Sequence, residues 1–221
     1  MMRPIASMSA RVGSLCVVVA LSLAVAGCAS SPSTNFYTLS SVAAPASPSR
    51  PVQAPAAVVA IGPVTLPDYV DRPQIVTRES AYAVKLAPYD QWAGPLTDMV
   101  PRVLIENVAT ALPGDRVVGF PSASETAFDY RVAVDITRFD ADQTGTATLV
   151  ARWQVYDRSA RRALLVTDET FVRPSSGPSY EAIVAAMSGT LADLSGRLAE
   201  GVGIAAAAKP AASEPARVST R

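Results

Sequence analysis

The spacing of apolar residues changes twice along the chain, and this change constrains the fold more than any other feature. Residues 92–112 and 180–202 place apolar side chains at the spacing of one helical face. Between them, residues 130–136 and 149–155 alternate apolar with polar side chains, as strands with one buried face do. The pattern therefore predicts two amphipathic helices that flank a β region.

Proline and glycine set the expected limits of the first helix. Pro95 suits its first turn, whereas Pro101 should kink the helix or mark its true start. The pair Pro113-Gly114 should end it.

Further strands are expected on both sides of the first helix. Residues 57–64 form a β-branched run, and residues 74–78 and 82–86 have the pattern of a short hairpin. Residues 163–173 form a third long strand after 130–136 and 149–155, and the short polar connectors predict an antiparallel meander. We therefore expect an α+β fold, an α/β sandwich in which two amphipathic helices pack on a mixed, largely antiparallel sheet.

The N-terminus has the pattern of a secretory signal. Arg3 and Arg11 precede an apolar run at residues 15–27, which is shorter than the ~20 residues that span a bilayer. The run ends in Val25-Ala26-Gly27-Cys28, which resembles a lipobox. We expect residues 1–27 to be removed and Cys28 to carry a diacylglycerol and an N-acyl lipid. An ordinary cleaved signal with an incidental cysteine is the alternative.

This anchor has consequences for compartment and chemistry. Ala29 and Ser30 follow the cysteine in place of an aspartate, so the outer membrane, on its periplasmic face, is the expected location. Cys16 would leave with the signal, so a mature chain could form no internal disulfide. The chain has 19 basic and 19 acidic residues, and without a basic excess we expect no nucleic-acid partner.

Composition divides the remaining chain into three parts. Residues 28–56 have the composition of a Pro/Ala/Ser-rich linker, in which 36–39 could add an edge strand. As a flexible tether, about 25 such residues have an r.m.s. span near 30 Å, and an added edge strand would shorten the tether. Residues 57–204 form a single expected domain, and 205–221 an expected disordered tail.

The chain offers little for catalysis. It contains no histidine, which removes the commonest general base and the commonest zinc ligand. Carboxylate pairs occur at Asp140/Asp142, which we expect in a turn, and at Asp168/Glu169. We expect no enzyme, no metal and no cofactor beyond the lipid on Cys28.

Two stretches are candidates for partner binding. The first contains Phe36 and Tyr37, and an added edge strand is favoured over a docking peptide. The second, residues 66–76, holds its backbone extended before Pro67 and Pro73. Its candidate contacts are Asp68, Tyr69, Asp71 and Arg72. Either an Asp–Arg pair stabilises this turn, or the loop is an interface, where tyrosine and arginine are enriched.

The same residues resemble the PqiC family, also called ABC-type transport auxiliary lipoproteins. The resemblance includes the Cys28 motif, residues 36–39, 61–64, 66–76 and 92–96, and Trp153. Its most specific part is the Leu-Pro-x-Tyr-x-Asp-Arg-Pro stretch, whereas Pro101 departs from it.

The resemblance implies a fold similar to the TolB N-terminal domain. It also implies a periplasm-facing outer-membrane lipoprotein that supports envelope integrity. Its partners would be an MCE-domain protein and the associated inner-membrane component of a lipid transport system, and it would assemble into a homo-oligomeric ring. The alternative function is a scaffold or assembly lipoprotein for an outer-membrane protein or a cell-wall complex.

Overall fold

A computed structural model describes residues 32–42, 56–121, 127–158 and 162–208. The chain divides into two compact units, residues 1–33 and 34–221, and the second contains all the helices and strands described. The expected signal peptide, Cys28 and residues 209–221 lie outside the described residues.

Eight strands and two helices make up the described part of the chain. The strands are β1 (Asn35–Tyr37), β2 (Val58–Thr65), β3 (Gln74–Arg78), β4 (Val84–Trp92), β5 (Arg116–Gly119), β6 (Tyr130–Asp142), β7 (Ala147–Asp157) and β8 (Ala163–Arg173). The helices are α2 (Leu96–Ala111) and α3 (Tyr180–Ala208).

The sheet is organised around the long strand β6. One side of β6 pairs with β7, which pairs in turn with β8, and these pairings are antiparallel. The other partners of β6 are β2, opposite its first half, and β3, opposite its last residues. The strands β5, β4 and β1 extend the sheet beyond β2 and β3.

The direction of the pairings corrects one expectation. The predicted meander of β6, β7 and β8 is confirmed. However, four of the seven pairings among the described strands are parallel, namely β1–β4, β2–β5, β2–β6 and β3–β6. The expected largely antiparallel sheet is therefore wrong, because strands that are distant in sequence pair side by side. The similarity to the TolB N-terminal domain stays a prediction.

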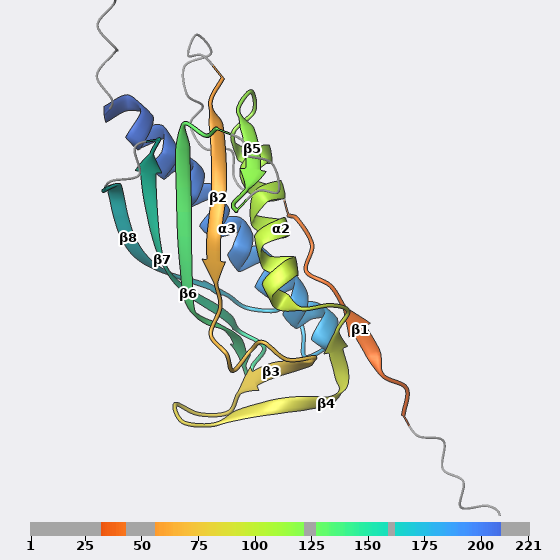
Figure 1. Cartoon of the computed structure of the whole chain (residues 1–221). Coiled ribbons are helices and arrows are strands. Elements are labelled where there is room, and N and C mark those ends of the chain that lie inside the picture. The colour runs from red at the N-terminus through yellow and green to blue at the C-terminus, as the bar shows by residue number, and fades with distance from the viewer. Residues whose placement is uncertain (1–31, 43–55, 122–126, 159–161, 209–221) are drawn as a thin grey trace, which may run out of the picture. The chain divides into compact units, whose positions relative to one another are not determined.

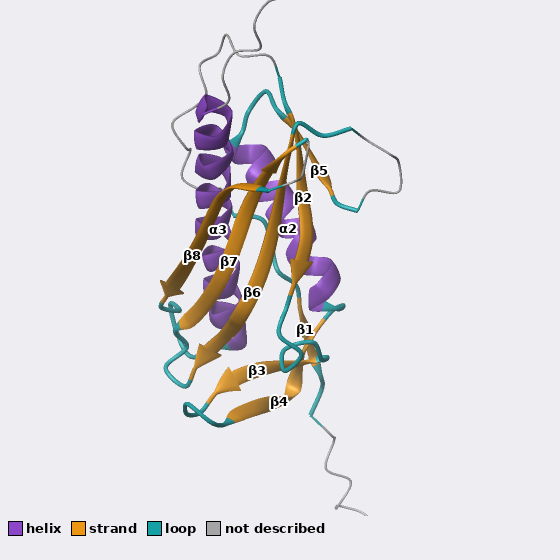
Figure 2. Ribbon diagram, turned by 60° about the vertical axis from the view of Figure 1, so that its left-hand side comes forward, coloured by secondary structure: helices purple, strands orange, loops and turns teal. Residues whose placement is uncertain are grey.

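Both helices lie on one face of the sheet, so the domain has two layers (Figures 1 and 2). The core between the layers includes Trp153 and Phe139 from the sheet and Leu194 from α3, all nearly without exposure. Close approach of α3 to the sheet depends on Gly201, where a Cβ atom would lie 2.5 Å from the Trp153 ring. The opposite face of the sheet carries no helix among the described elements (Figure 2).

The helix limits agree with most of the proline signals. Pro95 is the N-cap of α2, and Leu112 follows the last residue of the helix, just before Pro113-Gly114. The helix continues through Pro101, so the possibility that Pro101 marks its start is wrong. Helix α3 runs to Ala208, four residues beyond the expected end of the domain.

The segment expected to be a linker is partly folded. Residues 35–37 form β1, which pairs with the end of β4 at the edge of the sheet. The expected edge strand was 36–39, and residues 38 and 39 lie beyond β1. Leu39 is 1% exposed and belongs to the core. The chain then follows α2 (Figure 1). We call residues 35–42 the N-terminal strap.

Both helices hold the end of the strap. The Ser41 hydroxyl donates to Asn107 Oδ1 over 2.6 Å, and the Val42 amide donates to the same oxygen over 3.1 Å. The Ser40 amide donates to Ser188 Oγ of α3 over 3.3 Å. These bonds to buried side chains, together with Leu39, make the strap part of the domain.

Candidate partner-binding surface

The loop between β2 and β3 contains most of the predicted contact residues and is held by its own backbone. The Val70 amide donates to Pro67 O over 3.1 Å, and the Arg72 amide donates to Val70 O over 2.8 Å. The Val70 side chain is 2% exposed and packs in the core. The sequence forms this loop because Pro67 and Pro73 restrict the backbone conformation of the residues before them. Burial of the Val70 side chain holds the middle of the loop against the core.

Tyr69 connects the loop to a buried carboxylate. Its hydroxyl donates to Asp140 Oδ2 over 2.7 Å, and the Asp140 side chain has no exposure. Burial, and then the bond to Asp140, raise the pKa of Tyr69. Tyr69 therefore holds the loop in place and is not a free contact residue.

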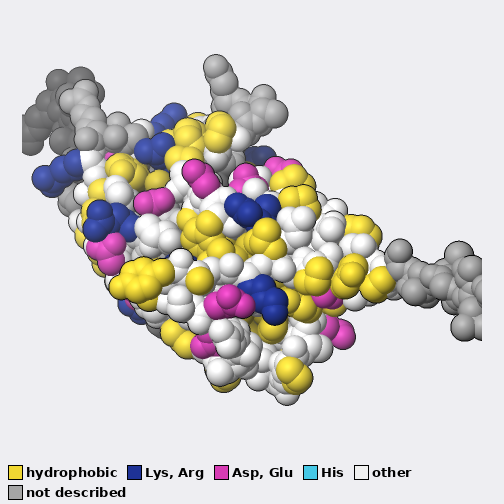
Figure 3. All heavy atoms as spheres, turned by 90° about the horizontal axis from the view of Figure 1, so that it is seen from below, with side chains coloured by type: hydrophobic (Ala, Val, Ile, Leu, Met, Phe, Trp, Pro, Cys, Tyr) yellow, Lys and Arg dark blue, Asp and Glu magenta, His cyan; other side chains and the backbone are white. Residues whose placement is uncertain are grey.

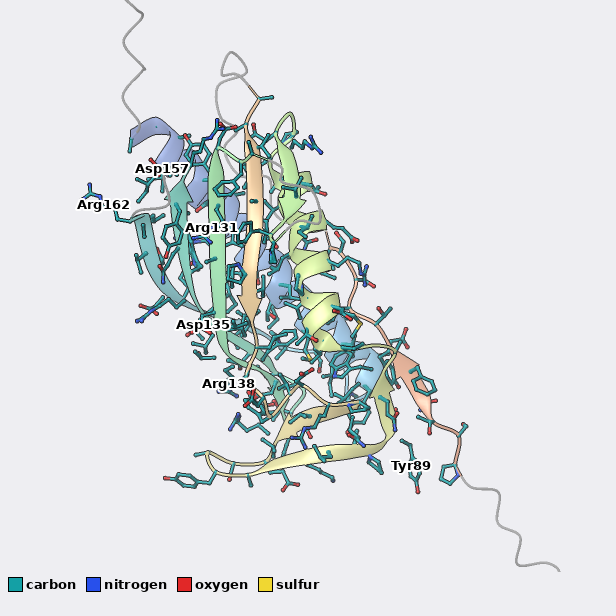
Figure 4. All side chains as sticks on the ribbon, viewed as in Figure 1. Tyr89, Arg131, Asp135, Arg138, Asp157 and Arg162 are labelled. Carbon is teal, nitrogen blue, oxygen red and sulfur yellow. The ribbon has the colours of Figure 1, made fainter. Side chains whose placement is uncertain are left out.

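Two arginines complete the surroundings of Asp140. Arg78 of β3 donates from Nη2 to Oδ2 over 2.7 Å, and Arg138 of β6 donates from Nε to Oδ1 over 3.0 Å. Arg138 lies near the lower end of β6 (Figure 4). Asp140 therefore joins the loop, β3 and β6, and we call Tyr69, Arg78, Arg138 and Asp140 the Asp140 cluster.

The remaining loop residues face solvent. Asp68, Asp71 and Arg72 are exposed. Among the described residues, Arg72 forms no ion pair, so a turn stabilised by an Asp–Arg pair is not what the structure shows. A rigid backbone thus presents two carboxylates and one guanidinium.

The two predicted aromatic residues of the strap have different environments. The Phe36 side chain is 65% exposed. The Tyr37 hydroxyl donates to Asp90 Oδ1 over 2.9 Å, and its ring lies 6.4 Å from that of Tyr180. Burial, and then the bond to Asp90, raise the pKa of Tyr37. Phe36 is available for contact, whereas Tyr37 fixes β1.

The fold brings these two stretches to the same end of the sheet. Tyr37 is opposite Trp92 in the β1–β4 pairing, and the Trp92 amide donates to Pro73 O over 2.7 Å. Only the end of β4 separates them, so their backbones are about two strand spacings, roughly 10 Å, apart.

The carboxylate pairs singled out as chemical candidates have structural partners. Asp140 is in a strand, which corrects its expected place in a turn. Asp142 does stabilise a turn, accepting from the Thr144 amide over 2.8 Å. Asp168 pairs with Arg152 over 2.8 Å, and Glu169 accepts from Trp153 Nε1 over 2.9 Å.

Sequence reasoning missed Asp90, Asn107 and Arg78 because their partners are 53 to 66 residues away. It missed Arg138 because Asp140 was expected in a turn, whereas in β6 the two residues, two positions apart, lie on the same face. Within the described ranges, no three acidic side chains come together as a metal site would require. Neither α2 nor α3 combines the length and apolar character of a membrane-spanning helix.

A family comparison decides the classification. Residues 37–199 match the model of the ABC-type transport auxiliary lipoprotein component. The chain belongs to this family. Its members are auxiliary lipoproteins of ABC-type transport systems, so membership implies a lipid anchor in a membrane. The match begins at Tyr37, within β1, and ends inside α3.

Solved structures agree with this family fold. Protein XCC0632 from Xanthomonas campestris is similar with a TM-score of 0.64 and 22% identity, over 79% of this chain and 97% of that one. An uncharacterized protein is similar with a TM-score of 0.63 and 18% identity, over 77% and 99%. The PelC dodecamer from Paraburkholderia phytofirmans is more distant, with a TM-score of 0.35 and 13% identity over 67% of this chain and 93% of that one. No curated protein matches the chain.

Proposed function

We propose that this auxiliary lipoprotein is the outer-membrane subunit of an MCE-type lipid transport system. In this role it is anchored through lipid on Cys28, faces the periplasm and supports envelope integrity. It binds an MCE-domain protein that works with an inner-membrane component. Family membership supports a role in transport, and the resemblance stated above supplies the finer assignment.

The observation that carries the proposal is the loop between β2 and β3. Its backbone is fixed by the Asp140 cluster and by Val70, whereas Asp68, Asp71 and Arg72 remain exposed. A preorganised loop loses little conformational entropy on binding, and an arginine can bond a partner carboxylate with two parallel hydrogen bonds. The loop therefore has the properties of a docking element.

The first test is in-cell crosslinking through this loop. A photoreactive residue in place of Asp71 should capture an MCE-domain protein from cells that contain the full lipidated chain. Replacing Arg72 by Ala should reduce this capture at least several-fold without lowering the urea midpoint. The matched control is Arg102→Ala, which removes another exposed arginine, on α2, and should leave capture unchanged.

Other results of this experiment would count against the proposal. Capture of outer-membrane assembly or cell-wall proteins would favour the scaffold alternative. An unchanged capture together with a lowered urea midpoint would show that Arg72 acts in folding alone.

The anchor is tested separately. Replacing Cys28 by Ser should move the chain from the membrane fraction to the periplasmic fraction, since lipid is the main source of membrane affinity. A ring of several copies is a further expectation of the resemblance, and native mass spectrometry of the lipidated chain in detergent would reveal it.

A further inference from the structure

Exposed apolar side chains gather at one end of the domain. Ten large hydrophobic side chains are exposed among the described residues, and five of them lie on β1, β4 or the turn before β4. These five are Phe36 (65% exposed), Tyr82 (100%), Val84 (40%), Leu86 (40%) and Tyr89 (45%). We call them the end patch. Clusters of this kind mark binding surfaces more often than isolated exposed residues do.

The end patch occupies the lower end of the domain. The β3–β4 hairpin lies below the rest of the sheet in both ribbon views. Seen from below, hydrophobic side chains are spread over this end between acidic and basic ones (Figure 3). Lys85 lies between Val84 and Leu86 and is itself exposed.

The start of the strap is close in sequence to the proposed anchor. Asn35, the first residue of β1, is opposite Asp90 in the β1–β4 pairing, so the chain leaves the sheet beside Tyr89. Cys28 precedes Asn35 by seven positions. Seven residues span at most about 25 Å when fully extended, and about 15 Å on average when flexible.

A lipid attached to Cys28 would therefore hold this end of the domain within a short distance of the bilayer. A flexible tether of about 25 residues, as expected from composition, would not hold this end of the domain near the bilayer. The strap removes that freedom by fixing residues 35–42 to β4, Asn107 and Ser188.

We infer that the end patch rests on the lipid surface that carries the anchor. Tyrosine is favoured at the membrane interface, because its ring is apolar and its hydroxyl remains hydrated. Lys85 is exposed on the same strand, and its long side chain can extend the ammonium group to lipid phosphates. This inference rests on the proposed lipidation of Cys28, and it assigns Phe36 to lipid and not to the protein partner.

The free edge of β4 limits how deep this contact goes. Apart from its last residues, which pair with β1, β4 pairs only with β3 among the strands that the structure describes. Unpaired backbone groups are costly in hydrocarbon, so side chains enter the interfacial region while the β4 backbone stays hydrated.

Two residues argue against a protein strand as the occupant of this edge. Pro88, in the middle of β4, has no amide hydrogen to donate, and Lys85 places a charge near the start of the strand. Both features disfavour the addition of another strand at an edge. Neither hinders contact with a lipid surface.

The test places a fluorescent reporter in the end patch of the full lipidated chain. Tyr82 is fully exposed, so Tyr82→Trp should fold normally. Val166→Trp is the matched control, because Val166 is 55% exposed and is opposite Gln154, which pairs with the start of β6. The β3–β4 hairpin pairs instead with the last residues of β6. The native Trp92 and Trp153 are buried. Their background emission is measured on the parent chain.

Each variant is reconstituted in vesicles of phosphatidylethanolamine and phosphatidylglycerol that contain a brominated lipid as quencher. The Tyr82→Trp emission should be quenched by bromine several-fold more than that of Val166→Trp, and should be less accessible to acrylamide.

Equal bromine quenching of the two reporters on anchored protein would overturn the inference while leaving the anchor intact. Protection of Tyr82→Trp from both quenchers would also overturn it, because protein would then cover the patch. Failure of the parent chain to remain with the vesicles would overturn the lipid anchor in the proposed function, and the inference with it.

Discussion

Asp140 shows how much of the candidate surface depends on one buried side chain. Its two oxygens accept from Tyr69 in the loop, Arg78 in β3 and Arg138 in β6. The sequence placed Asp140 in a turn because a second aspartate and a glycine follow it closely. No local pattern could show Tyr69 and Arg78 as its partners, because they are 71 and 62 residues away.

Replacing Asp140 by Asn should therefore destabilise the domain. The substitution leaves Arg78 and Arg138 without their carboxylate, and removal of one member of a buried ion pair costs about 3 kcal/mol. Urea unfolding of the variant should show a clearly lower midpoint. Asp168→Asn is the control, because the Arg152–Asp168 pair is more than half exposed on both sides and should contribute much less. Equal shifts in the two variants would contradict the role of Asp140.

At the scale of elements, the strap is the feature that composition concealed. Alanine, proline and serine predicted a linker, yet residues 35–42 include a strand and a core residue. The apolar residues of 36–39 were the available signal, and Phe36 and Tyr37 do lie in β1. The bonds of residues 40–42 to the helices could not be predicted, because small polar residues have the same composition in a linker and in a packed segment.

Replacing Leu39 by Ala should measure the contribution of the strap to folding. Leu39 is 1% exposed, and truncation of a buried leucine costs about 2–5 kcal/mol. Val42→Ala, at a side chain that is 42% exposed, should change the urea midpoint far less. If both variants unfold like the parent, the strap is not part of the cooperative unit.

The direction of strand pairing also could not be predicted from the sequence. Alternation identified β6, β7 and β8, and short connectors gave their antiparallel order. The partners of β1, β2 and β3 are distant in the chain, so no connector length specifies them. Strand β5 has only four residues, too few for a period to be recognised.

At the scale of the whole molecule, the absence of histidine shapes the response to pH. No side chain of ordinary pKa titrates between about pH 5 and pH 8. The free energy of unfolding should therefore be nearly constant over this range. A transition near pH 6.5, about where histidine titrates, would contradict this expectation.

Stability should fall on both sides of this range, for different reasons. Hydrogen bonding from Thr144 lowers the pKa of Asp142 in the folded chain. The Asp142 carboxylate therefore stabilises the fold at pH values above its pKa in the unfolded chain. This stabilisation is lost as the pH falls through the lower pKa of the folded chain. Burial raises the pKa of Tyr69 in the folded chain. The neutral Tyr69 phenol therefore stabilises the fold at pH values below its pKa in the unfolded chain. This stabilisation is lost as the pH rises through the higher pKa of the folded chain. Urea midpoints measured across the pH range would check both limbs, and Tyr69→Phe should weaken the alkaline one.

The outer strand β8 has a consequence for crowding at a membrane surface. Among the described strands it pairs only with β7, so one side of an eleven-residue strand is open. Asp168 and Glu169 are at its centre. Any antiparallel self-pairing centred there would set carboxylate against carboxylate, which is unfavourable. Copies of this lipoprotein that meet on a membrane are therefore discouraged from fusing their sheets through β8.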